Sequence, residues 1–126
     1  MLFELTSQKS LEAIDRDLRE AAARHKFGVI AVHNLKETMA NKGVAFEGEC
    51  LIYEICNPHQ AKRVLETNGA VSAALPCRIS VYRTEGGYKL VTLLPSALMQ
   101  IFGDAQLAPA AQEVEADILA MMREAA

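Results

Sequence analysis

The chain has 126 residues, of which 51% are hydrophobic and 23% charged, and its formal net charge at pH 7 is −3. This length suits one domain with a single core, so residues 1–126 are expected to form a single domain, and the composition excludes a disordered chain. Thirteen lysines and arginines against 16 acidic residues argue against nucleic acid as a partner, because phosphate binding needs a basic surface.

No stretch approaches the length of about 18 apolar residues that a membrane-spanning helix needs, so no membrane segment is expected. The residues from Met1 to Leu5 lack the charged region and the long apolar region of a signal peptide. Three cysteines are an odd number, which disfavours a disulfide framework. The sequence therefore predicts a cytoplasmic protein.

The first two elements are a strand and a helix. Residues 2–6 alternate apolar and polar side chains, which indicates a short strand. A helix follows, capped by Ser7 or Ser10. It is expected to end near His25 and Lys26, basic residues that suit its negative end, with His25 on the surface. Its apolar stripe consists of Leu11, Ile14, Leu18, Ala21 and Ala22.

The apolar run at residues 29–33 predicts a central strand. Asn34 then suits the N-cap of a short helix that stops near Gly43. Residues 44–48 are expected to form a loop that leads into the next strand.

A strand-to-helix junction at Cys56 is the most informative stretch. Residues 50–56 are rich in β-forming residues and predict a strand. Asn57 then suits a helix N-cap, and Pro58 suits the first helical position, where its missing N–H costs nothing. Gln60 lies at the spacing of a capping box. The thiol of Cys56 is therefore predicted just ahead of helix N–H groups that lack helical partners.

Two opposite effects act on this thiol. A helix N-terminus favours the thiolate and can hold an anion. Glu54 shares a strand face with Cys50, Ile52 and Cys56, and its charge disfavours the thiolate by repulsion. The sequence does not decide between these effects, and a small, inert core cysteine is the alternative interpretation.

A second motif that joins a proline to a thiol, Leu75-Pro76-Cys77-Arg78, begins the next strand. Period-two alternation places Cys77 on the core face and Arg78 on the other face. Because the connector returns from the helix to the sheet, it is expected to close one side of the junction. The candidate ligand site there consists of Cys56, Asn57, Pro58, Cys77, Glu54 and Arg78. The alternative is that both motifs only fix the helix on the sheet.

The remaining segments predict a hairpin and two helices. Glu85-Gly86-Gly87 is a turn between a strand over residues 77–82 and a return strand over residues 88–94. Residues 96–102 form a short helix or turn, residues 103–108 form a loop, and Pro109 opens a final helix. One face of that helix carries Val114, Ile118, Met121 and Met122.

The predicted order is β-α-β-(α)-β-α-β-β-(α)-α. Strands and helices alternate in part, while the hairpin over residues 77–94 is antiparallel. This pattern favours an α+β fold with one mixed or antiparallel sheet and helices packed mainly on one face.

The two cysteine motifs also carry a family resemblance. The run Glu54-x-Cys56-Asn57-Pro58, followed by Leu75-Pro76-Cys77-Arg78, resembles the bacterial and archaeal family called domain of unknown function 302. Phe27-Gly28-Val29 and Gly86-Gly87 also fit, so the resemblance covers nearly the whole chain. It implies a compact, dimeric α+β domain with a fold like that of the TATA-binding protein, and no established activity.

Several catalytic templates are absent, including the phosphate-binding P-loop, the glycine-rich dinucleotide motif, the G-x-S-x-G elbow and C-x-x-C. Without a complete catalytic set, the sequence favours a non-enzymatic homodimer that binds a small ligand or a partner. Leu51, Tyr53, Tyr82 or Tyr88 on the uncovered face of the sheet are expected to form the dimer surface or a pocket floor.

The alternative function is thiol redox chemistry, or binding of a soft metal such as copper or haem iron, by Cys56 and Cys77. A crossover between parallel strands would place these cysteines at opposite ends of the sheet. Their Cα atoms would then exceed the roughly 7 Å limit for a disulfide. The sequence itself identifies no cofactor and no metal.

Overall fold

A computed structural model describes all residues from Met1 to Ala126. The strands are β1 (Leu2–Ser7), β2 (Gly28–Asn34), β3 (Cys50–Cys56), β4 (Cys77–Thr84) and β5 (Gly87–Leu93). The α-helices are α1 (Leu11–Arg24), α2 (Leu35–Ala40), α3 (Pro58–Thr67), α4 (Pro95–Gln100) and α5 (Ala108–Ala125). Two short 3₁₀ helices, η1 (Gly69–Ala74) and η2 (Ala105–Leu107), lie where the sequence predicted a connector and a loop.

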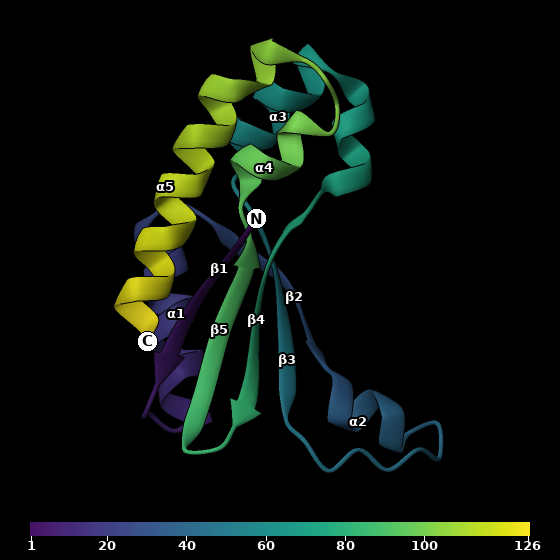
Figure 1. Ribbon diagram of the computed structural model, residues 1–126, viewed down its shortest axis with the longest axis vertical. Coiled ribbons are helices and arrows are strands. Elements are labelled where there is room, and N and C mark those ends of the chain that lie inside the picture. The colour runs from purple at the N-terminus through teal and green to yellow at the C-terminus, as the bar shows by residue number, and fades with distance from the viewer.

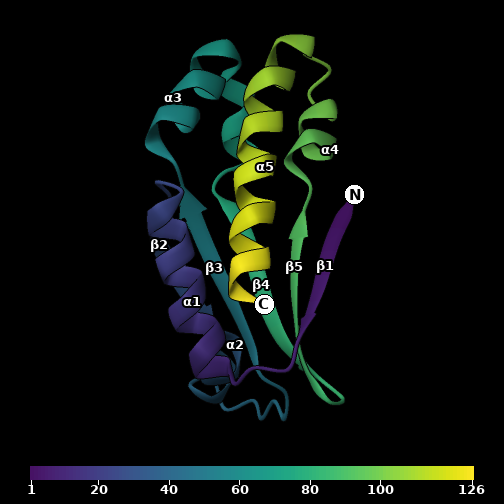
Figure 2. The same cartoon turned by 90° about the vertical axis from the view of Figure 1, so that its left-hand side faces the viewer.

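The five strands form one antiparallel sheet in the order β1-β5-β4-β3-β2 (Figure 1). Helices α1 and α5 lie side by side on one face of this sheet (Figure 2). The predicted α+β class and element order are confirmed, and the sheet is the antiparallel one of the two predicted alternatives.

Alternation of side chains along the strands, interrupted in β2 by an irregularity between Val29 and Ala31, separates two faces. The face under α1 and α5 carries the main core, where Tyr53, Ile79 and Leu90 are fully buried. The hydroxyl of Tyr53 donates to Asp15 on α1 at 2.6 Å. We call the other side the open face.

Of the four residues predicted on the uncovered face of the sheet, only Tyr82 lies there. Tyr53 is buried beneath the helices, and Leu51 and Tyr88 pack against the same core. Tyr82 alternates with the buried Val81 and therefore lies on the open face. Both faces of β3 carry apolar residues, so its sequence pattern alone did not say which face the helices cover.

Helix α1 is fixed to α5 at its carboxyl end, where the sequence predicted a surface histidine. The His25 ring lies 2.5 Å from the Glu124 carboxylate and 3.4 Å from that of Asp117. Its bond to Glu124 raises the pKa of His25 above the ordinary value.

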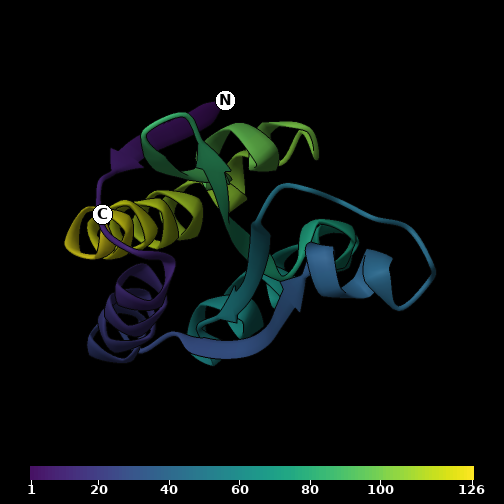
Figure 3. The same cartoon turned by 90° about the horizontal axis from the view of Figure 1, so that it is seen from below.

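The two ends of the sheet differ. Helices α3 and α4 gather at the end where β3 and β5 finish, and α2 lies at the opposite end (Figure 1). At the end of the sheet where α3 and α4 lie, a second, small core consists of Val64, Val71, Leu107 and Ala110. Seen along the sheet, α2 and its loop stand apart from α1 and α5 (Figure 3). No helix is long and apolar enough to cross a membrane.

Candidate functional site

Asn57 caps α3 as predicted. Its side-chain oxygen accepts hydrogen bonds from the backbone N–H groups of His59 at 3.1 Å and Gln60 at 3.3 Å. Its carbonyl accepts the N–H of Ala61 at 2.9 Å, and Pro58 has no N–H to offer. The expectation that this junction exposes free helix N–H groups is therefore wrong, because the cap itself uses them.

The capping box is only half formed. The side chain of Gln60 does not turn back to Asn57 but donates to Glu113 on α5 at 3.0 Å. Arg63 also binds Glu113, so this carboxylate joins α3 to α5. The junction thus fixes α3 to its neighbours as well as to the sheet.

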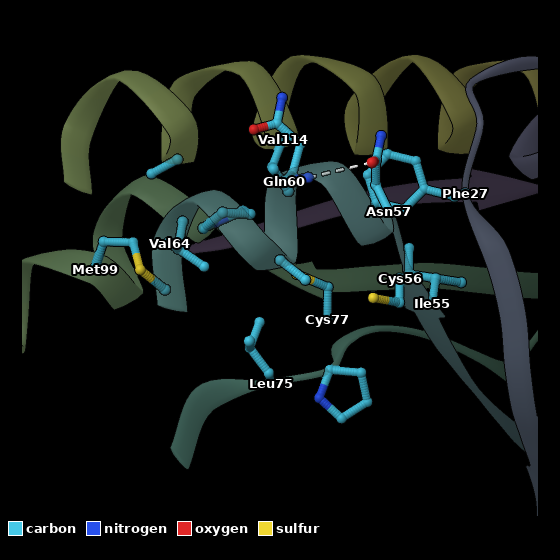
Figure 4. Close-up of a pocket in the computed structure, with 14 residues that line it drawn as sticks. Phe27, Ile55, Cys56, Asn57, Gln60, Val64, Leu75, Cys77, Met99 and Val114 are labelled. Carbon is cyan, nitrogen blue, oxygen red and sulfur yellow. Dashed lines mark hydrogen bonds between the residues drawn. The ribbon is translucent and has the colours of Figure 1, made fainter. Parts of the chain in front are cut away.

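A small cavity lies behind the junction (Figure 4). Its volume is about 40 Å³, room for about one water molecule. Fourteen residues line it, and those from the two cysteine motifs are Cys56, Asn57, Leu75, Pro76 and Cys77. The buried Oε1 of Gln60, another lining residue, has no hydrogen-bond partner.

The two cysteines of these motifs lie next to each other. Strands β3 and β4 are antiparallel neighbours, and Cys77 pairs directly with Ile55, the residue before Cys56. The expectation that Cys56 and Cys77 lie at opposite ends of the sheet is therefore wrong. It assumed parallel strands, whereas the connection through α3 and η1 returns the chain to the same end.

All three cysteines are free and half-buried. Burial, with a smaller contribution from nearby Cys56, raises the pKa of the Cys77 thiol to about 11. Burial also raises the pKa of Cys50. No group of three His, Cys, Asp or Glu side chains is arranged to hold a metal ion.

Glu54 and Arg78 lie elsewhere, on the open face. They are paired across β3 and β4, with Arg78 Nη2 3.8 Å from Glu54 Oε1. The same carboxylate oxygen lies 2.8 Å from Nε2 of His33 on β2. Of the six predicted site residues, Cys56, Asn57 and Cys77 line the small cavity, Glu54 and Arg78 lie on the open face, and Pro58 begins α3 without lining the cavity.

A much larger hollow, which we call the groove, lies on the open face between the sheet, η1 and α4. Its volume is about 700 Å³. The lining residues are Leu2, Ile52, Ala73, Ala74, Leu75, Pro76, Cys77, Arg78, Ser80, Val91, Thr92, Leu93, Pro95, Leu98, Ile101 and Phe102. Leu75, Pro76, Cys77 and Pro95 also line the small cavity, so they form a wall between the two spaces.

Sequence reasoning found only part of this groove. It singled out Cys77 and Arg78 and the Leu75-Pro76 wall, but not the residues of β5 and α4. The available sign was the short apolar segment over residues 96–102, whose Ile101 is 70% exposed in the structure. Ile101 follows directly after α4 and lines the groove together with Leu98 and Phe102, so the apolar residues there form a contiguous surface.

Comparison with known proteins identifies one family. The model of the family described as "Domain of unknown function DUF302" matches residues 3–125. The crystal structure of an uncharacterized conserved DUF302 protein from Bacillus stearothermophilus is similar to this chain, with a TM-score of 0.94 and 27% sequence identity. That similarity covers 99% of this chain and 98% of the other. No curated protein matches the chain.

Proposed function

Since the chain belongs to the family called domain of unknown function 302, whose name assigns no activity, we propose a function from its site: a homodimeric module that binds a small, mainly apolar ligand in the groove. The groove volume of about 700 Å³ carries this proposal, because ligand pockets usually measure about 300–1,000 Å³. Eleven of the 16 lining residues are hydrophobic, which is also typical of such pockets.

The predicted site residues take different roles in this proposal. Cys77 and Arg78 contact the ligand from the groove wall and floor. Cys56, Asn57 and Pro58 act at a distance, because they fix the start of α3 and with it the connector that leads to the wall. The cavity behind them is too small for more than about one water molecule.

Support for a dimer comes from the composition of the open face. It exposes the apolar side chains of Leu2 and Leu93, which lie on the neighbouring strands β1 and β5. Outside the groove, it also carries side chains of both charge signs, paired as Lys89 with Glu4. A two-fold interface brings the same patch of both copies together, so a patch that carries apolar side chains and both charge signs is self-complementary.

Titration with the neutral fluorophore Nile red tests ligand binding. We expect saturable binding with one site per chain, because the groove offers one continuous apolar surface. Fluorescence that rises linearly without saturation would contradict the proposal. Light scattering at micromolar concentration tests the dimer separately: twice the mass of one chain is expected, and a clean monomer removes the dimer claim.

One observation favours the second candidate function, thiol chemistry by Cys56 and Cys77. Both residues line the same small cavity at neighbouring strand ends, so the distance argument against their pairing no longer holds. The raised pKa of Cys77 acts in the opposite direction, because the thiolate is the reactive form.

Alkylation with iodoacetamide distinguishes the two functions. With a pKa of about 11, Cys77 is mostly protonated at pH 7–8.5 and becomes reactive only as the pH rises toward 11. In a variant that carries Cys50→Ser and Cys56→Ser, we expect Cys77 to react on the order of a hundredfold more slowly than a thiol of ordinary pKa. Rapid labelling near neutral pH, or a Cys56–Cys77 disulfide under mild oxidation, would favour thiol chemistry over the binding module.

A further inference from the structure

The groove contains one charged side chain. Among its 16 lining residues, Arg78 is the only lysine, arginine, aspartate or glutamate, and the rest are apolar apart from Ser80, Thr92 and the thiol of Cys77. Thr92 already uses its hydroxyl to donate to the backbone carbonyl of Arg78 at 2.7 Å. A ligand in the groove therefore meets a broad apolar surface and a single positive charge.

The guanidinium of Arg78 is available to a ligand. Its side chain is 63% exposed, and its nearest acidic oxygen, Oε1 of Glu54, is 3.8 Å away. That separation is longer than a hydrogen bond, for which N···O distances are about 2.7–3.2 Å. Glu54 Oε1 instead lies 2.8 Å from His33, so Glu54 is held by another partner.

Ser80 adds a second polar group on the same strand face. It follows Arg78 by two residues on β4, so both side chains project to the open face. It pairs with Ile52 on one side and Val91 on the other, which gives its hydroxyl apolar neighbours across both strands. A guanidinium and a hydroxyl two residues apart on one strand face, with apolar neighbours around them, can together bind one small anionic group.

The charges near this point select the kind of anion. A planar guanidinium matches the two oxygens of a carboxylate through paired N–H···O bonds. One positive charge balances a monoanion, whereas the neighbouring Glu54 carboxylate, 3.8 Å from Arg78, repels the second charge of a phosphate monoester.

From these observations we propose that the groove binds an amphipathic monocarboxylate, with its apolar body against α4 and β5 and its carboxylate on Arg78 and Ser80. This inference rests on the proposed function, since it names the class of ligand for the same groove. Leu93, Leu98 and Phe102 provide the apolar contacts for the body. Arg78 provides the discrimination between a carboxylate and a neutral molecule of the same length.

Displacement of Nile red by three ten-carbon probes tests this class: decanoate, 1-decanol and decylammonium. Decanoate is expected to displace the dye at a concentration at least tenfold lower than decanol, and decylammonium is expected to be the weakest. In Arg78→Gln, decanoate should lose about tenfold or more in affinity, as charge-assisted hydrogen bonds imply, while decanol should be unchanged. Arg78→Lys should recover part of the loss, since it restores the charge without the planar fork.

Arg16→Gln is the matched control. Arg16 lies on α1, its side chain is 64% exposed, close to the 63% of Arg78, and it lies outside the groove. This variant removes the same charge and should leave all three probes unchanged. Melting temperatures of both variants should stay near that of the natural chain, because both side chains are largely exposed.

Two failures are distinguishable. If decanol and decanoate compete equally and Arg78→Gln alters neither, the carboxylate class is wrong while the groove remains a ligand site. If Nile red itself does not bind saturably, the proposed function fails, and the ligand class fails with it. Stronger binding of decylammonium than of decanoate would also overturn the assignment to Arg78.

Discussion

Replacing Ile79 with alanine is expected to lower the free energy of unfolding by about 3 kcal/mol, within the range for buried isoleucines. Ile79 is fully buried on β4, the central strand of the sheet. The loss combines the transfer of apolar atoms to water with the cavity left between sheet and helices. Denaturation in urea, with an unchanged slope against denaturant, measures this change.

Ser80→Ala is the neighbouring control. Ser80 projects from the same strand to the open face, so its removal should change the free energy of unfolding by less than about 0.5 kcal/mol. The same variant should weaken decanoate binding, whereas Ile79→Ala should not alter the groove floor directly. Equal losses of stability in the two variants would mean that the open face is as buried as the helix-covered face, and the groove would not exist in solution.

Val91→Glu should have the largest effect on ligand binding. Val91 lies on the groove floor beside Ser80, where a bound apolar molecule must exclude water from any group beneath it. A carboxylate there must lose its water when an apolar molecule binds, which costs free energy, and each ~1.4 kcal/mol is a tenfold change in affinity. We expect Nile red to bind at least about 30-fold more weakly, and decanoate to lose more because its charge is repelled.

Val44→Glu provides the same chemical change outside the groove. Val44 is 54% exposed in the loop after α2, at the other end of the sheet (Figure 1). Its substitution should leave the affinities for Nile red and decanoate unaltered. If both glutamate variants weaken binding equally, the effect is one of overall charge, and the groove is not where the probes bind.

Local features of the fold were predictable because they depend on neighbouring residues. Asn57 and Pro58 defined the start of α3 through cap chemistry alone, and residues 50–56 form β3 with the predicted bounds. The apolar stripe of the final helix, which includes Ile118 and Met121, is buried as its spacing indicated. Each of these patterns depends only on residues that lie close together in the sequence.

The site was less predictable because it depends on strand order. The same residues between β3 and β4 can connect parallel or antiparallel strands, and only the second brings Cys77 next to Cys56. The groove is lined by residues of four strands, β1, β3, β4 and β5, and one wall comes from α4, which follows β5. No local pattern states that Leu98 on α4 and Ala74 at the end of η1 face the same space.

The pairing of β1 with β5 also has a consequence for the order of events during protein synthesis. Leu2 pairs with Leu93, and α1 packs on α5, so β1 and α1 are synthesised well before the strand and the helix that cover them. Until then, the apolar stripe of α1 has no permanent cover and the edge of β1 has no partner strand. Contacts this distant in sequence form late and slowly, so the apolar stripe of α1 and the unpaired edge of β1 stay accessible to chaperones until β5 and α5 have been synthesised.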